Sequence, residues 1–246
     1  MGLLEGKTAI ITGGATGIGR GIARAYAREG ATLVLASRNR DNLERTASEF
    51  RSKYGVTVLV VPADATIEAE VADLFATTAK ELGRLDILVN NAGSGIYVPL
   101  DEMSLENWET VFAVNLTAAF LCTREAIRVM KGQGGGRIIN IGSISATKPR
   151  PGQSAYSASK AGLVSLTRST LLEGRAFGIS AGCLHPGLVD VTPESSYAGP
   201  TTTPDEPAIA PQDIAEAALA MAQLPPHVTM LDTTVLPSHQ IFIGRG

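Results

Sequence analysis

The chain has 246 residues, of which 44% are apolar and 18% charged, a composition that excludes disordered, collagen-like and disulfide-stapled proteins. Its formal net charge of -3 gives no electrostatic reason to expect a nucleic acid or an anionic membrane surface as a partner. No stretch reads as a membrane span or secretory leader, and Cys122 and Cys183 lie in apolar runs typical of buried reduced thiols. We expect a cytoplasmic protein that binds a small molecule.

Short apolar strands and helical segments alternate along the chain. Strands are predicted at residues 7–12, 32–37, 56–61, 86–90, 137–141, 179–184 and 228–236. Helices are predicted at residues 17–29, 39–53, 66–82, 104–130, 154–177 and 212–223. This alternation predicts one α/β domain over residues 1–246, built on a doubly wound parallel sheet with helices on both faces.

One segment, residues 190–211, interrupts the alternation. It is rich in Pro, Ser and Thr and shows no periodicity, and long loops of this kind inside compact domains are often functional lids. We interpret it as a lid over the substrate. The loops at residues 94–98 and 145–151 are expected to line the same pocket.

A glycine-rich turn, TGGATGIG at residues 12–19, joins the first predicted strand to the first helix. Glycines there let the backbone approach a pyrophosphate, and the amides of the helix N-terminus point at it. The strand before the turn and the helix after it favour a dinucleotide site over a purely structural turn. The residues assigned to cofactor binding in this turn are Gly13, Ala15, Thr16, Gly17, Ile18 and Gly19.

The end of the second predicted strand carries Ser37 and Arg38. An acidic side chain at this place suits the free 2′-hydroxyl of the adenosine ribose, whereas a basic one suits a 2′-phosphate. Because no carboxylate is present and Arg40 adds positive charge, the sequence predicts NADP(H) as the cofactor. The alternative is that Arg38 and Arg40 only solvate the loop.

Tyr156 and Lys160 lie four residues apart and share one face of a predicted helix. A free tyrosine has a pKa near ~10 and is a poor base at neutral pH, but a neighbouring cation favours the phenolate. By itself such a pair is weak evidence, because many helices carry one by chance. Ser143, after the fifth strand, is placed to hold a substrate carbonyl oxygen. Asn115, in an apolar helix, either organises a proton-relay water or marks a helix kink.

These motifs together resemble those of the short-chain dehydrogenase/reductase family. They occur in its order, from residue 5 to about residue 190: TGGATGIG, Asn90-Asn91-Ala92-Gly93, Asn115, Ser143, Tyr156 with Lys160, and Pro186-Gly187. The resemblance implies a Rossmann-type fold and hydride transfer between NADP(H) and a small carbonyl or alcohol substrate. It also implies a homodimer or homotetramer.

The resemblance further implies a role for each matching residue. Asn115, Ser143, Tyr156 and Lys160 are similar to the catalytic set of the family. The residues that resemble the rest of its cofactor pocket are Asp64 and Ala65 at the adenine ring, Asn91, Ala92 and Gly93 on the adenosine side, Lys160 at the nicotinamide ribose, and Pro186, Gly187 and Val189 at the nicotinamide; Tyr156 is counted among the cofactor contacts as well. Thr192 stands one position later than the usual threonine of the family, so its contact is left open.

Two other functions stay open at this point. One is a non-catalytic NADP-sensing or interaction protein on the same fold, and the other is an epimerase or dehydratase that uses the same Tyr and Lys. The complete set of four residues favours the oxidoreductase. Ile96, Tyr97, Leu188 and Tyr197 hint at a neutral, partly apolar substrate, and three scattered histidines predict no metal site.

Overall fold

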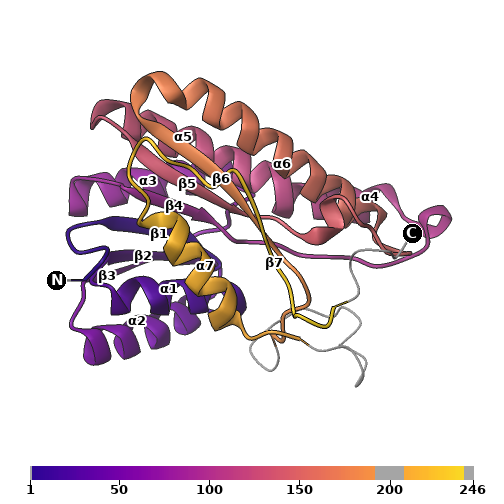
Figure 1. Ribbon diagram of the computed structural model, residues 1–246, viewed down its shortest axis with the longest axis horizontal. Helices are drawn as coiled ribbons and strands as arrows, with labels where there is room; N and C mark the ends of the chain where they lie inside the picture. The colour runs from indigo at the N-terminus through magenta and orange to yellow at the C-terminus, as the bar shows by residue number, and fades with distance from the viewer. Residues whose placement is uncertain (1, 192–207, 241–246) are drawn as a thin grey trace.

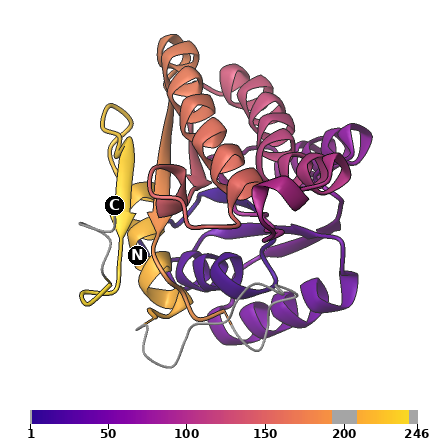
Figure 2. The same cartoon turned by 90° about the vertical axis from the view of Figure 1, so that its right-hand side faces the viewer.

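The computed structural model describes residues 2–191 and 208–240. Most of the expected lid, including Thr192 and Tyr197, lies outside the described residues. Figure 1 shows a sheet with helices packed on both faces, and Figure 2, seen from its right-hand side, separates the two helical layers. The predicted α/β architecture is therefore confirmed.

The described residues contain one sheet of seven parallel strands in the order β3-β2-β1-β4-β5-β6-β7. The strands are β1 Thr8–Thr12, β2 Thr32–Ser37, β3 Val58–Pro62, β4 Ile87–Asn90, β5 Gly136–Ile141, β6 Ile179–Pro186 and β7 Asp232–Val235. The chain winds outward from β1 to β3, returns to β4 beside β1, and then winds outward to β7. This reversal between β1 and β4 creates the crevice in which open α/β sheets bind ligands.

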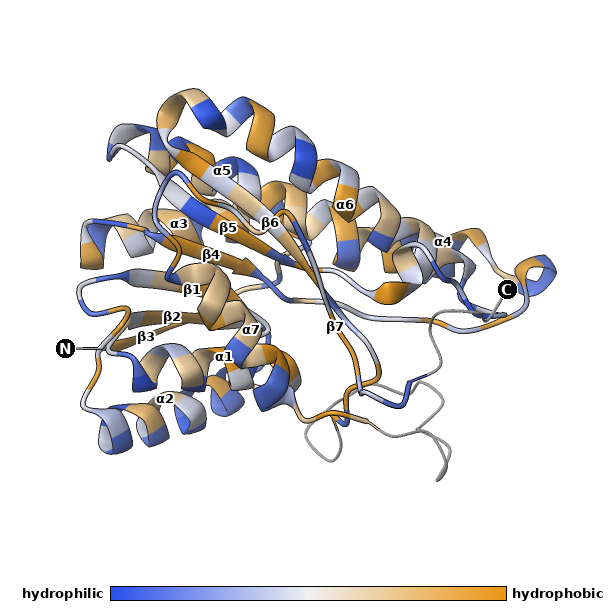
Figure 3. Ribbon diagram, viewed as in Figure 1, coloured by the Kyte–Doolittle hydropathy of each residue, from blue (hydrophilic) through white to orange (hydrophobic). Residues whose placement is uncertain are grey.

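The helices fall into two layers that bury opposite faces of the strands. Their bounds are α1 Gly17–Arg28, α2 Arg40–Tyr54, α3 Glu68–Leu82, α4 Leu105–Phe112, α5 Ala118–Gly132, α6 Ser154–Gly174 and α7 Pro211–Ala222. Ile11 joins the core beneath α1, α2 and α7, whereas its neighbour Ile10 joins the core beneath α3 and α5. Because successive strand residues point to opposite faces, a strand covered on both sides is apolar throughout. Figure 3 shows this contrast between the hydrophobic strands and the hydrophilic outer turns of α2.

The predicted helix at residues 104–130 is not regular. A π-helical segment, Ala113–Thr117, separates α4 from α5 and contains Asn115. The continuous helical stretch Leu105–Gly132 has the length and hydropathy of a membrane span, contrary to the expectation that no stretch does. Half of its apolar window is buried inside the fold, where α5 packs Leu121 and Met130 into the core. It is a buried core helix, and its apolar character follows from that packing.

The last predicted strand, residues 228–236, is shorter in the structure, where β7 begins at Asp232. The amide of Val228 donates to the carbonyl of Pro225 at 2.9 Å, so the chain is still in a turn at that point. Pairing with β6 begins at Cys183 opposite Asp232. The apolar residues before Asp232 have the composition of a strand, but the sequence does not show where pairing with a partner strand starts.

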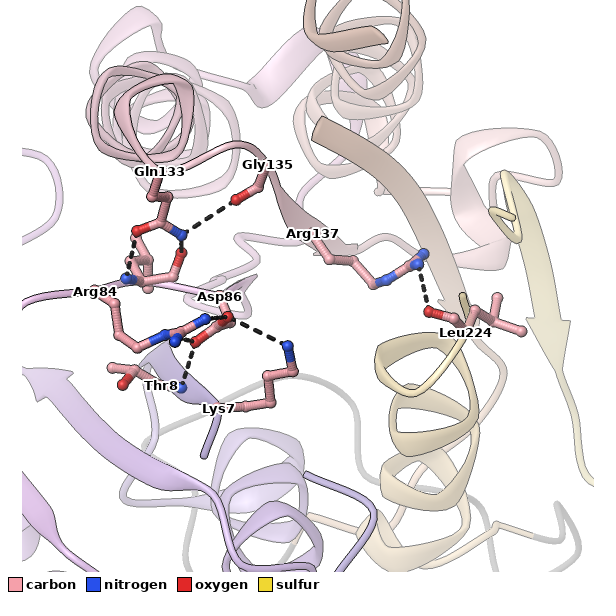
Figure 4. A network of polar contacts seen from close by, with 9 residues as sticks. Lys7, Thr8, Arg84, Asp86, Gln133, Gly135, Arg137 and Leu224 are labelled. Atoms are coloured by element: carbon pink, nitrogen blue, oxygen red, sulfur yellow. Dashed lines mark hydrogen bonds and ion pairs between the residues drawn. The ribbon is translucent and has the colours of Figure 1, made fainter. Parts of the chain in front are cut away.

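The amino ends of the strands are tied together by the carboxylate of Asp86 (Figure 4). It accepts hydrogen bonds from the backbone amide of Thr8 at 2.9 Å and from Arg84 at 2.6 and 2.8 Å, and Lys7 lies 3.5 Å away. Burial opposes ionisation of Asp86, but these hydrogen bonds outweigh it and hold its pKa below the ordinary value. The contacts fasten the start of β1 to the start of β4.

Candidate active site

The glycine-rich turn is closed by contacts with the end of β4. Nδ2 of Asn91 donates to the carbonyl oxygens of Thr12 at 2.9 Å and Gly13 at 3.3 Å. The hydroxyl oxygen of Thr12 in turn accepts from the amides of Asn91 and Ala92, at 3.0 and 3.1 Å. A Cβ on Gly19 would lie 2.2 Å from the carbonyl oxygen of Gly13, so the turn closes this tightly only with glycine at that position.

The first amides of α1 face the crevice at this turn. Gly17 opens the helix with a φ of 50°, in the left-handed region that favours glycine. Thr16 occupies the N-cap position without a side-chain bond to these amides, and the first turn of this described helix carries no acidic residue. Free amides at a helix N-terminus, with the positive end of the helix dipole behind them, suit an anionic group. The cradle therefore fits a pyrophosphate.

Ser37 is the last residue of β2 and Arg38 follows it, while Asp64 lies just beyond the carboxyl end of β3. The Asp64 carboxylate accepts from the amide and hydroxyl of Thr66, at 2.9 and 2.7 Å. Burial opposes its ionisation, but the Thr66 bonds and the charge of Arg38 outweigh it and lower its pKa. The structure thus brings Arg38 and Asp64 close enough to interact, with the half-buried Ala65 next to them.

Lys160 is buried deep beneath Tyr156 on α6. Its ammonium nitrogen donates to the carbonyl oxygen of Ile141 at 2.7 Å and lies 5.8 Å from the centre of the Tyr156 ring. Only 3% of Lys160 is exposed, and this burial lowers its pKa to about 8. The half-buried ring of Tyr156 also lies next to that of Tyr97, with ring centres 6.0 Å apart. A buried cation next to a phenol is an arrangement that favours phenolate formation.

Three hydrogen bonds hold the side chain of Asn115, which lies in the π-helical segment. Its Oδ1 accepts from the amide of Ser94 at 2.8 Å, and its Nδ2 donates to the carbonyl oxygen of Ser94 and the hydroxyl of Ser159. That hydroxyl donates onward to the carbonyl oxygen of Tyr156 at 2.8 Å. The π-helical segment agrees with the interpretation of Asn115 as a helix irregularity, and the relay water stays a prediction.

A Cβ on Gly93 would lie 3.4 Å from Oδ1 of Asn115 and 3.5 Å from Nζ of Lys160. The loop after β4, the π segment and α6 therefore meet at one point. The site residues expected from the sequence at these three places are brought together.

Ser143 lies at the carboxyl end of β5, where the next residues form a short 3₁₀ turn. Its hydroxyl oxygen accepts from the amide of Ser145 at 3.1 Å, and its carbonyl oxygen lies 3.1 Å from Nδ1 of His185. Sequence reasoning missed His185 as a site residue and considered it only as a metal ligand. Its place directly before Pro186 on β6, next to β5 in the sheet, was the available signal.

The turn Pro186-Gly187 ends β6 and is covered by a segment near the C-terminus. A Cβ on Gly187 would lie 2.4 Å from Oε1 of Gln240, and this oxygen accepts from the amide of Leu188 at 2.9 Å. Val189 then forms a bridge to Ile209. Gln240 was not singled out from the sequence, which carries no local signal for a contact so distant along the chain. Within the described residues no cluster of His, Cys, Asp or Glu is suited to a metal ion.

Residues 7–201 match the family described as short chain dehydrogenase. Uncharacterized oxidoreductase YxjF of Bacillus subtilis (strain 168) is 41% identical over 184 residues, which are 75% of this chain and 71% of the relative. Alcohol dehydrogenase from the archaeon Thermococcus sibiricus, complexed with 5-hydroxy-NADP, is 29% identical with a TM-score of 0.83, covering 93% of this chain and 95% of its own.

L-sorbose reductase from Gluconobacter frateurii, complexed with NADPH and L-sorbose, is 27% identical with a TM-score of 0.85, and the match covers 96% of this chain and 97% of that one. The matched regions include the glycine-rich turn and the site around Tyr156. The chain therefore belongs to the short-chain dehydrogenase/reductase family of oxidoreductases.

Proposed function

We propose that this protein transfers a hydride between NADP(H) and a small carbonyl or alcohol substrate, with Tyr156 as the general acid and base. The observation that carries the proposal is the buried ammonium of Lys160 beneath the Tyr156 ring, at 5.8 Å from its centre. Family membership supports the reaction class, and the uncapped amides of the glycine-rich turn support a dinucleotide.

When bound, the nicotinamide supplies or accepts the hydride. The amides of residues 13–19 hold the pyrophosphate, and Lys160 binds the nicotinamide ribose beside the turn of Pro186, Gly187 and Val189. In reduction, the Tyr156 hydroxyl donates a proton to the substrate oxygen while the Ser143 hydroxyl donates a hydrogen bond to it. The charge of Lys160 stabilises the resulting phenolate, and in oxidation the same phenolate takes the proton back.

The preference for NADP(H) rests on charge at the end of β2. Arg38 is exposed there, and its positive charge helps to lower the pKa of Asp64. Arg38 therefore lies near the residue that is proposed to hold the adenine. Arg40 lies 4.0 Å from Glu44 and is partly neutralised, so Arg38 carries the preference. The complexes of the Thermococcus and Gluconobacter proteins with NADP-type cofactors support it. Asp64 and Ala65 are proposed to hold the adenine, and Asn91, Ala92 and Gly93 to line the adenosine side.

The test follows NADPH absorbance, with NADH in parallel, against ketones, aldehydes, 3-oxoacyl thioesters and quinones. Turnover with NADPH is expected, and Tyr156→Phe should lower it by about 10²- to 10⁴-fold while NADPH binding is retained. Tyr54→Phe, a change of the same kind on α2, is the matched control. Unchanged turnover in Tyr156→Phe would refute the mechanism, and NADPH binding without turnover on any substrate would favour a sensing protein.

A further inference from the structure

His185 connects the loop of Ser143 to the edge of the sheet. His185 is 8% exposed, with Nδ1 at 3.1 Å from the carbonyl oxygen of Ser143 and Nε2 at 3.3 Å from Oδ1 of Asp232. The other oxygen of Asp232 accepts from Arg168 at 3.0 Å. The chain of contacts thus runs from Arg168 on α6 through Asp232 on β7 and His185 on β6 to the carbonyl oxygen of Ser143.

The side chain of His185 acts where the backbone pairing of β5 with β6 stops. Pairing in register ends at Ile141 opposite Leu184, and the amide of Gly142 makes one more bond to the carbonyl oxygen of Leu184. Pro186 has no amide hydrogen, so β6 has no backbone donor at that position. The imidazole of His185 contacts the chain beyond that point, at the Ser143 carbonyl oxygen, which also accepts from the amide of Ala146 at 3.1 Å.

The packing around the ring leaves it little freedom. A Cβ on Gly142 would lie 2.6 Å from Nδ1 of His185 and 2.8 Å from Sγ of Cys183, so the ring lies flush against the backbone before Ser143. Both partners of the ring, a carbonyl and a carboxylate, are hydrogen-bond acceptors. Each ring nitrogen can donate to its acceptor only if it carries a proton, and the hydrogen bond to the Ser143 carbonyl oxygen therefore needs a proton on Nδ1.

We propose that His185 is a positioning residue for the reaction, which holds the Ser143 peptide, and with it the Ser143 hydroxyl, in place while Asp232 orients the imidazole ring. The inference rests on the proposed function, because it assigns Ser143 a contact with the substrate oxygen. A hydroxyl displaced by about 1 Å can lower turnover by up to about 100-fold. The glycine-rich turn proposed to hold the pyrophosphate lies between β1 and α1, so that part of the cofactor site does not depend on this contact.

The kinetic test compares three variants of the full chain. His185→Phe removes both donors and should lower kcat by about 10- to 100-fold, while the Kd for NADPH changes far less because the pyrophosphate contacts stay in place. His185→Asn places an amide nitrogen near the position of Nδ1 and should recover most of that loss, although it cannot reach Asp232. The control is His227→Asn, at an exposed histidine before β7, and it should behave as the unmodified protein.

A second measurement does not depend on turnover. The chain has three histidines, so ¹⁵N spectra of the imidazoles of the cofactor-free protein can be assigned with the His185→Asn variant. We expect a proton on Nδ1 of His185. A ring protonated only on Nε2 would overturn the inference, as would equal kcat losses in the Phe and Asn variants or no loss in either. Absence of turnover in the unmodified protein refutes the proposed function itself, whereas turnover undiminished in His185→Phe refutes only the positioning role.

Discussion

Replacing the buried Lys160 with methionine should make the folded protein more stable at pH 7 while it removes turnover. Burial lowers the pKa of this lysine from its ordinary value of 10.5 to about 8. Between these two values the unfolded chain binds more protons than the folded one, so the contribution of Lys160 to stability rises with pH across that window. Above the pKa of 10.5 of the unfolded chain, burial of the neutral lysine carries no ionisation cost. As the pH falls through about 8, that cost is present in full.

The magnitude follows from the difference between the two pKa values. About 2.5 units correspond to about 3 kcal/mol of unfavourable free energy at pH 7, and about 1 kcal/mol of it remains at pH 10. Methionine removes this term but also leaves the carbonyl of Ile141 without its donor, which costs about 1 kcal/mol at every pH. The variant should therefore be more stable by about 2 kcal/mol at pH 7 and close to the unmodified protein at pH 10.

Urea denaturation from pH 7 to pH 10, followed by fluorescence of the single tryptophan, Trp108, measures both proteins at one protein concentration. Burial also raises the pKa of Cys122 to about 12, but this thiol is present in both proteins. Its effect therefore cancels in the difference between their free energies of unfolding. Lys80→Met is the control for loss of a lysine charge, because 82% of that side chain is exposed. A stability gap that does not shrink as the pH rises, or a variant less stable at pH 7, would refute the reasoning.

Four further predictions concern the same chain. In the free enzyme, kcat/KM for carbonyl reduction should be constant below about pH 8 and fall above it as Lys160 loses its proton; a profile flat to pH 10 contradicts this. Arg38→Ala should raise the KM for NADPH by about 10- to 100-fold and leave that for NADH unchanged; equal changes argue against a 2′-phosphate contact. Gly19→Ala should abolish NADPH binding in a titration, because its Cβ would lie 2.2 Å from the carbonyl oxygen of Gly13. The control Gly132→Ala has open space around its Cβ, and its free energy of unfolding in urea should rise by about 0.5–1 kcal/mol. Tyr26→Phe should lower the free energy of unfolding by about 1–2 kcal/mol, because a buried carbonyl on α7 loses its donor at 3.1 Å; no change would mean that the bond is immaterial.

The order and type of the elements were predictable because most strands are short, largely apolar runs and the helices between them repeat their apolar residues every three to four positions. Ile10 and Ile11 show why: adjacent residues enter different cores, so no polar residue interrupts the strand. A helix irregularity at Asn115 was one of the two sequence interpretations, but its π-helical form was not predictable, since it goes with contacts to Ser94 and Ser159 from other parts of the chain. The start of β7 at Asp232 likewise depends on its partner strand.

The candidate site was predictable where a local pattern carries its geometry. Tyr156 and Lys160 share a helix face, and the glycine-rich turn lies between a strand and a helix. The residues that sequence reasoning missed act across the fold instead: His185 reaches a peptide 42 residues earlier, and Gln240 reaches one 52 residues earlier. Such contacts follow from the strand order and the path of the C-terminal segment, and neither appears as a spacing in the chain.

The polar groups discussed at the amino ends of the strands have different surroundings from those at the carboxyl ends. At the amino ends, the carboxylate of Asp86 is matched by Arg84 and the amide of Thr8, an arrangement that stabilises its charge. At the carboxyl ends, Lys160 is buried against its own charge, and the buried Oδ1 of Asn90 accepts no hydrogen bond within the described residues. Both groups lie at the edge proposed to bind the cofactor and substrate. Because β1 and β4 run from one end to the other, the contacts at Asp86 hold the register on which the geometry of the site depends.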